Sequence, residues 1–73
     1  MKWLNYTEQK PDKEGFYAIM YCFGPTEGFL PDSDYWDGKK WDSNLPVCLF
    51  SSQIFDDYEA AGQWANDNDI EDC

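Results

Sequence analysis

Tyr35-Trp36-Asp37-Gly38-Lys39-Lys40-Trp41, in the middle of this chain, predicts a β-hairpin. An Asp-Gly pair between aromatic residues is a strong signal for a tight turn between antiparallel strands. The glycine can adopt the positive φ that such a turn needs, and the aspartate tolerates it better than most residues. We therefore expect strands near residues 33–36 and 39–42, joined by a two-residue loop.

This register also predicts which side chains meet. With a two-residue loop, Trp36 lies opposite Lys39, and Asp34 lies opposite Trp41. Because side chains alternate along a strand, the four share one face of the hairpin, and the two indoles make a diagonal contact. The hairpin therefore predicts an aromatic core on one side of a small sheet.

Three further segments complete the predicted sheet. Residues 16–23 are eight consecutive apolar or aromatic residues between glycines, which is typical of a central strand covered on both faces. Residues 47–50 read as a short buried strand that pairs with the central strand or with the hairpin. Residues 1–8 predict a short extended segment that packs Trp3 or Leu4 against the core.

The end of the chain changes character and predicts a helix. Asp56 with Glu59 three residues later fits a capping box. A helix over residues 57–66 would place Tyr58, Ala61 and Ala65 on one face, with Trp64 beside them. The expected fold is α+β: a three- to four-stranded antiparallel sheet with one C-terminal helix packed on a face. Residues 1–73 form a single domain, and we expect a flexible acidic tail from about residue 67.

Composition explains how so short a chain can fold. Aromatic residues make up 19% of the 73 residues, and each large ring buries about 150–250 Å². Cys22 and Cys48 fall in apolar runs, Cys73 ends the sequence, and no C-x-x-C motif occurs. The first eight residues lack the apolar segment of a secretory signal. These features predict a reducing, cytoplasmic setting.

Charge is segregated along the chain. The net charge is −10, yet all five lysines lie in residues 1–40, where seven acids accompany them. Residues 41–73 carry eight acids and no basic residue. A field of one sign repels nucleic acid and anionic membranes and favours a basic partner, or it serves only to keep the protein in solution.

The sequence supplies little for catalysis or for ligand chemistry. It has no His and no Arg, and no glycine-rich phosphate loop. The segment 67–72 begins like a calcium loop, but Asp72 stands where the loop requires glycine. Two lysines beside Trp36 and Trp41 are too few to hold a phosphate backbone. We therefore expect no enzyme activity, no cofactor, no metal site and no direct binding of nucleic acid.

Part of the pattern resembles short, uncharacterised phage and prophage proteins. Those proteins open with a Trp, carry a P-x-x-G-x-Y strand and place a Y-x-D-G-x-x-W hairpin in mid-chain. Here Trp3, then Pro11 with Gly15-Phe16-Tyr17, then the hairpin segment 35–41 are similar, although Pro11 and Gly15 are one residue further apart. The acidic helix and tail replace the family's Trp-Pro-rich end. The resemblance implies a phage origin and a small sheet, and it carries over no active site.

Size and charge give a second, looser analogy, to acidic phage inhibitors of bacterial defence. From these features we expect an anti-CRISPR or anti-restriction type of inhibitor that acts in the host cytoplasm. It would bind a basic, nucleic-acid-handling surface of a host protein complex, with imitation of nucleic acid as one mode. Tyr58 and Trp64 are the candidate aromatic anchors, and the candidate acidic face consists of Asp56, Asp57, Glu59, Asp67, Asp69, Glu71 and Asp72.

The alternative is a non-catalytic structural or regulatory module. Such a module would bind a partner, or a second copy of itself, through the aromatic face of the sheet. A third interpretation, an enzyme with paired carboxylates, would require a concave pocket that contains acids with raised pKa values.

Overall fold

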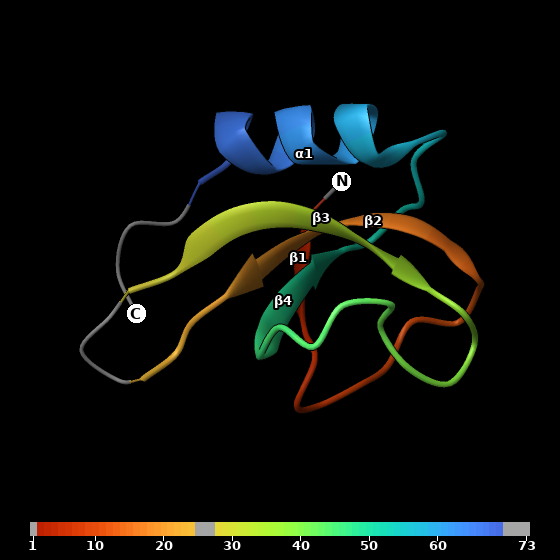
Figure 1. Cartoon of the computed structure of the whole chain (residues 1–73), viewed down its shortest axis with the longest axis horizontal. Helices are drawn as coiled ribbons and strands as arrows, with labels where there is room; N and C mark the ends of the chain where they lie inside the picture. Colours follow the sequence, from red (N-terminus) through yellow and green to blue (C-terminus); the bar gives the residue numbers. More distant parts are fainter. Residues whose placement is uncertain (1, 25–27, 70–73) are drawn as a thin grey trace.

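The computed structural model describes residues 2–24 and 28–69, and it confirms the predicted α+β fold. Four antiparallel strands form one sheet in the order β1-β4-β2-β3, and one helix covers a face of this sheet (Figure 1). The elements are β1 (Trp3–Asn5), β2 (Gly15–Tyr21), β3 (Leu30–Trp36), β4 (Val47–Ser51) and α1 (Tyr58–Asp67).

β2 is the central strand that the apolar run predicted. It pairs with β3 along its whole length, from Gly15 opposite Trp36 to Tyr21 opposite Leu30, and with β4 on its other side. Its side chains alternate between two clusters, because successive residues of a strand point to opposite faces. One cluster lies beneath α1, and the other lies on the far face of the sheet.

The cluster beneath α1 is built from small residues. Ala18 of β2 is fully buried against Ala61 and Ala65 of the helix. The predicted helical face is thus confirmed for the two alanines, and their size lets the helix lie close to the sheet. At the edge of this cluster, the ring of Trp3 in β1 contacts that of Trp64, with centroids 4.8 Å apart.

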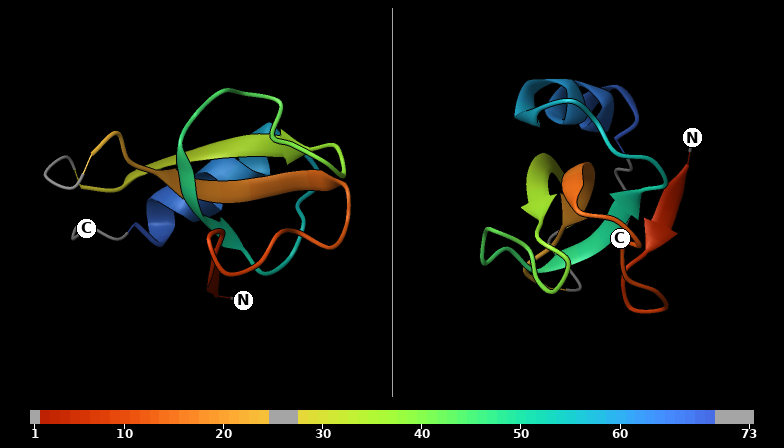
Figure 2. Two further views of the ribbon diagram at one scale, coloured as in Figure 1. Left: turned by 90° about the horizontal axis from the view of Figure 1, so that it is seen from below. Right: turned by 90° about the vertical axis from the view of Figure 1, so that its right-hand side faces the viewer.

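The opposite face of the sheet carries the aromatic core. Loops after β1 and β3 lie on this side of the sheet, away from α1 (Figure 2). The ring of Tyr6 lies within 5.9 Å of Trp36 and 5.8 Å of Trp41, measured between ring centroids. The buried members of the cluster are Tyr17, Ile19, Trp36, Trp41, Val47 and Phe50.

The hairpin forms, but its predicted register is wrong. Trp36 pairs with Trp41 rather than with Lys39, so residues 37–40 form a four-residue loop. The predicted second strand, residues 39–42, is reduced to the single bridge at Trp41. The cause is the Asp37 carboxylate, which accepts hydrogen bonds from the backbone N–H groups of Lys39 (2.8 Å) and Lys40 (2.9 Å). These bonds hold both lysines in the loop.

Substitution of Asp37 by asparagine should destabilise the hairpin in a pH-dependent manner. The N–H groups of Lys40 and Lys39 hold the pKa of Asp37 below its ordinary value. A lowered folded-state pKa adds stability that is fully present above the unfolded-state pKa and is lost as the pH falls through the folded-state value. We therefore expect Asp37→Asn to lower the thermal midpoint at neutral pH, and the deficit to disappear in acid.

Asp69→Asn is the control for this experiment, because Asp69 is exposed just beyond the C-terminal end of α1. Loss of a negative charge near that end of a helix does not lower its stability. Thermal melts followed by circular dichroism over a pH series measure both variants. A deficit in Asp37→Asn that is equal at all pH values would contradict the role given to the charge.

The helix begins one residue later than predicted. Asp57 is the N-cap, and its carboxylate accepts a hydrogen bond from the N–H of Ala60 at 2.8 Å. The predicted capping box of Asp56 with Glu59 is therefore wrong. With Asp57 as the cap, the residue three positions later is Ala60, whose methyl group cannot reach back to the cap.

Candidate functional site

The fold brings the start of α1 next to the end of the hairpin. Both lie at the same end of the molecule (Figure 1). The contact is made by Tyr58, the first residue of the helix, whose hydroxyl lies 3.4 Å from a carboxylate oxygen of Asp42 and donates to it. Asp42 directly follows the bridge residue Trp41, and its own N–H donates to the carbonyl of Tyr35 (2.9 Å). The hairpin thus fixes Asp42 beside the helix.

Tyr58 is held in place on one side and open on the other. Its ring packs edge-on against Phe16, with centroids 4.8 Å apart, and Phe16 packs in turn against Tyr35. The side chain nevertheless keeps 44% of its surface exposed. Partial burial raises the pKa of Tyr58, and the negative charges of Asp42 and Asp34 raise it further. Tyr58 is therefore a protonated hydrogen-bond donor in a negative field.

Three of the predicted acids lie at this same end. Asp56, Asp57 and Glu59 are all exposed. Asp57 and Glu59 also line a shallow depression on the outer side of α1, together with Ala60 and Gln63. We call Asp42, Asp56, Asp57, Tyr58 and Glu59 together the acidic surface. It presents four carboxylates around one half-exposed aromatic ring.

The other predicted acids are not all part of this group. Asp67 lies about two turns along the helix from Glu59, on the same side, with Gln63 between them. The side-chain amide of Gln63 donates a hydrogen bond to the carboxylate of Asp67 at 3.1 Å. Eight residues of helix span about 12 Å, so Asp67 extends the negative charge toward the far end of α1. Asp69 is exposed beyond it. Glu71 and Asp72 lie outside the described residues.

The second predicted anchor, Trp64, has a different environment. It is half-buried, and its ring contacts Trp3 at 4.8 Å and Phe55 at 6.1 Å between centroids. The indole of Trp3 also donates to the carbonyl of Asn68 (2.9 Å), which ties β1 to the end of the helix. Trp64 thus contributes to the packing of α1 on the sheet. Tyr58 is the better exposed of the two rings.

Sequence reasoning missed Asp42 as a member of the site. Asp42 stands 16 residues before Tyr58 and ends the predicted strand 39–42, away from the candidate acids. Only the four-residue loop places Asp42 next to the carbonyl of Tyr35 and within reach of the helix. With a two-residue loop, Asp42 would lie opposite Ser33 instead of Tyr35.

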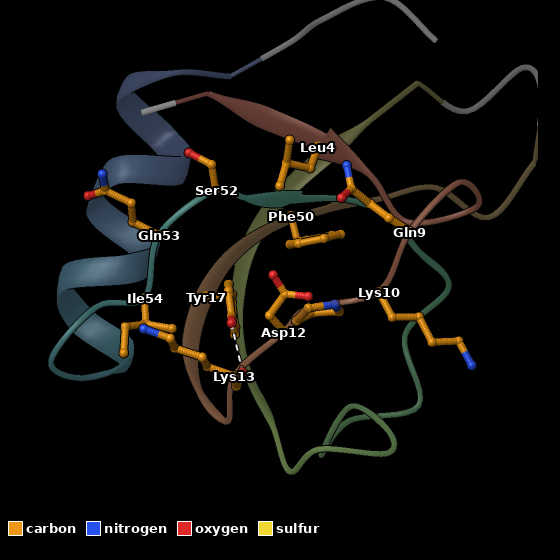
Figure 3. A pocket seen from close by; sticks show the side chains of 11 residues that line it. Leu4, Gln9, Lys10, Asp12, Lys13, Tyr17, Phe50, Ser52, Gln53 and Ile54 are labelled. Carbon is orange, nitrogen blue, oxygen red and sulfur yellow. Dashed lines mark hydrogen bonds between the residues drawn. The ribbon is translucent and has the colours of Figure 1, made fainter.

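A cavity of about 340 Å³ shares no lining residue with the acidic surface (Figure 3). The loop before β2, the middle of β1, and β4 with the segment that follows it line the cavity. Tyr17 and Phe50 belong to its apolar lining, the Asp12 side chain lies near both rings, and Lys10 points away. Burial raises the pKa of Tyr17, and the charge of Asp12 adds to the effect. The hydroxyl of Tyr17 donates to the carbonyl of Lys13 at 2.7 Å.

The two hydroxyl side chains that line this cavity, those of Tyr17 and Ser52, both have hydrogen-bond partners within the chain. Ser52, the hydroxyl on its rim, accepts a hydrogen bond from the N–H of Lys2 at 3.0 Å. Within residues 2–24 and 28–69, no three Cys, Asp or Glu side chains converge as they would around a metal ion. The helix found in the described part of the chain is too short and too polar to span a bilayer.

Comparisons of the chain with models of protein families, with curated proteins and with solved structures find no match.

Proposed function

We propose that this chain is a non-enzymatic inhibitor of the phage type, whose acidic surface binds a basic, nucleic-acid-handling surface of a host defence complex in the host cytoplasm. The observation that carries the proposal is the contact between Tyr58 and Asp42. It adds a carboxylate from the hairpin to those at the start of the helix, around a ring that is rigidly packed on one side and exposed on the other.

Rigid, partly exposed aromatic residues are effective anchors in protein interfaces. Tyrosine is enriched among the residues that dominate binding energy, because its ring buries a large area at a low cost in side-chain entropy. The surrounding carboxylates would supply charge complementarity to lysines and arginines of the partner, which raises the association rate and the selectivity. Duplex DNA carries about one charge per 1.7 Å, so a compact acidic surface can compete for a groove that binds nucleic acid.

The β3 edge of the sheet is a poorer binding surface, because β3 lacks open hydrogen-bond donors. The carbonyl of Tyr35 points out of the sheet, toward the N–H of Asp42, so alternate residues before it also face outward. Of these, Pro31 has no N–H, and the N–H of Ser33 donates to the Asp32 carboxylate at 2.8 Å. The N–H of Tyr35 donates to the carboxylate of the residue before it, also at 2.8 Å. Edge strands are protected against pairing by such devices.

The alternative, a module that binds through the aromatic face of the sheet, finds less support. Trp36 is only 2% exposed and Trp41 only 7%. Loops of the same chain lie on that side of the sheet. A partner would have to displace those loops before it could contact either indole, whereas the acidic surface is already exposed.

Neutralisation of the acids at the helix start should weaken partner binding. The triple variant Asp56→Asn/Asp57→Asn/Glu59→Gln removes three charges, and asparagine at position 57 preserves the helix cap. Each exposed charge pair contributes about 0.2–1 kcal/mol, so we expect affinity to fall about tenfold, which corresponds to about 1.4 kcal/mol. Wild-type binding should also weaken steeply as salt rises, because salt screens exposed charges.

The matched control is Glu8→Gln/Asp12→Asn/Glu14→Gln, which removes the same number of exposed charges from the loop before β2. Immobilised wild-type and variant chains are incubated with a bacterial lysate at low salt, and bound proteins are eluted with a salt step. Each captured protein is then purified, its affinity is measured, and duplex DNA is added as a competitor. Equal losses in the two triple variants, binding that is indifferent to salt, or no competition by DNA would each contradict the proposal.

A further inference from the structure

Two cysteines lie side by side at the end of the sheet away from the hairpin. Cys22 directly follows β2, and Cys48 belongs to β4. Their Sγ atoms are 3.5 Å apart, although 26 residues separate them in the sequence. The backbone N–H of Cys22 also donates to the carbonyl of Pro46 (3.4 Å), which fixes the end of β2 beside the start of β4.

An irregularity in the pairing of β2 with β4 produces this contact. Met20 pairs with Leu49, but the next residue, Tyr21, pairs with Val47. Cys48 is therefore the extra residue of a β-bulge. A bulge redirects the side chain that it carries, and here the thiol of Cys48 lies against that of Cys22. Both side chains are half-buried, so a small reagent can reach them.

We propose that Cys22 and Cys48 form a thiol pair that closes to an intramolecular disulfide when it reacts with a low-molecular-weight disulfide such as oxidised glutathione. The thiolate of one cysteine attacks the glutathione disulfide, which gives a mixed disulfide and releases one glutathione thiolate. The thiolate of the second cysteine then attacks the protein sulfur of the mixed disulfide and releases the second glutathione. The protein loses two protons and two electrons, and the small disulfide is reduced to two thiols.

The position of the pair favours closure over a lasting mixed disulfide. The second thiol is already in contact with the sulfur that it must attack, so the second step is intramolecular and fast. Closure requires the sulfur atoms to approach from 3.5 Å to about 2.05 Å. The bond would join β2 to β4 and would enclose β3 and the hairpin in one covalent loop. Because such a loop restricts the unfolded chain, the oxidised protein should melt at a higher temperature.

The test uses the full chain with Cys73 replaced by serine, so that only the proposed pair can react. The protein is incubated with oxidised glutathione, quenched with an alkylating reagent and analysed by intact mass spectrometry. We expect the loss of two hydrogen atoms, no alkylation and a raised thermal midpoint. The control is Cys48→Ser/Cys73→Ser, in which the single thiol of Cys22 should stop at the glutathione adduct.

Two results would overturn the proposal. One is a Cys73→Ser variant that keeps a glutathione adduct or stays fully open to alkylation. The other comes from peptide mapping of the oxidised wild-type chain: a bond from Cys73 to either partner in place of the Cys22–Cys48 bond. If the serine variants are poorly folded by circular dichroism, the wild-type map alone decides between the two pairings.

Discussion

Replacement of Trp36 by alanine is expected to lower the free energy of unfolding by about 3–5 kcal/mol, the usual cost of deleting a buried aromatic ring. Trp36 is 2% exposed, and its indole packs edge-on against Trp41 with centroids 5.0 Å apart. Stability of about 0.05–0.15 kcal/mol per residue is typical of small domains. A chain of 73 residues therefore has little reserve, and the variant should be largely unfolded at moderate temperature.

Chemical denaturation followed by circular dichroism measures this loss. Phe23→Ala is the matched control, because Phe23 is 67% exposed and a large ring is again deleted. We expect the control to change stability by less than about 0.5 kcal/mol. Trp36→Phe should fall between the two, because it keeps a ring in the cluster. A Trp36→Ala variant as stable as the control would show that the aromatic cluster is not the core.

Much of the fold could be predicted from the sequence, because local patterns dominate it. The eight-residue apolar run is too short for a buried helix and is bounded by glycines, and its first six residues, together with Gly15, form β2. The spacing of Ala61 and Ala65 predicted the buried side of α1, and both are fully buried. For α1 the spacing of the apolar residues specifies which face packs inward, and for β2 the uninterrupted apolar run indicates that both faces are covered.

The two errors have a common physical cause. The hairpin register and the helix start both depend on which backbone N–H groups donate a hydrogen bond to an aspartate side chain. Asp37 accepts hydrogen bonds from two N–H groups of the loop. Asp57, rather than Asp56, accepts a hydrogen bond from the first turn of the helix. Several neighbouring acids could serve as caps in this chain, and the sequence pattern does not distinguish between them.

Some members of the candidate site could be predicted from the sequence, and others could not. The acids at the helix start are visible in the sequence as a run without lysine, and they are exposed as expected. The membership of Asp42 follows from the loop length, which periodicity does not specify. Trp64 is a candidate anchor in the sequence because aromatic residues dominate binding hot spots, but its position beside the apolar face of the helix leads it to pack against Trp3. Exposure of an aromatic residue thus depends on contacts between distant strands.

Asp34 should be the polar residue whose loss has the largest effect on stability. It is 2% exposed, although it is a carboxylate on an edge strand. One oxygen accepts hydrogen bonds from the N–H groups of Tyr35 (2.8 Å) and Ser43 (3.2 Å). The other accepts a hydrogen bond from the Ser43 hydroxyl. Asp34 thus fastens the segment after the hairpin, which begins with Asp42, to the edge of the sheet.

Asp34→Ala is expected to cost about 3 kcal/mol, because a hydrogen bond to a charged group contributes about 1.5–3 kcal/mol and the abandoned donors are partly buried. Ser43→Ala removes one of these donors and should cost less. If the two residues act as one unit, the double variant should lose less than the sum of the single losses. Equilibrium denaturation of the four proteins measures this coupling. Strictly additive losses would show that Asp34 and Ser43 stabilise the chain independently.

Asp34 also connects the core to the acidic surface, which gives the same variants a second measurement. The charges of Asp42 and Asp34 both help to raise the pKa of Tyr58. Asp34→Asn removes one of these charges and keeps the shape of the side chain, so the pKa of Tyr58 should move down toward its ordinary value. A pH titration of the Tyr58 ring by NMR measures the shift. An unchanged pKa in Asp34→Asn would mean that the two groups do not interact, and that the negative field at Tyr58 comes from the exposed acids alone.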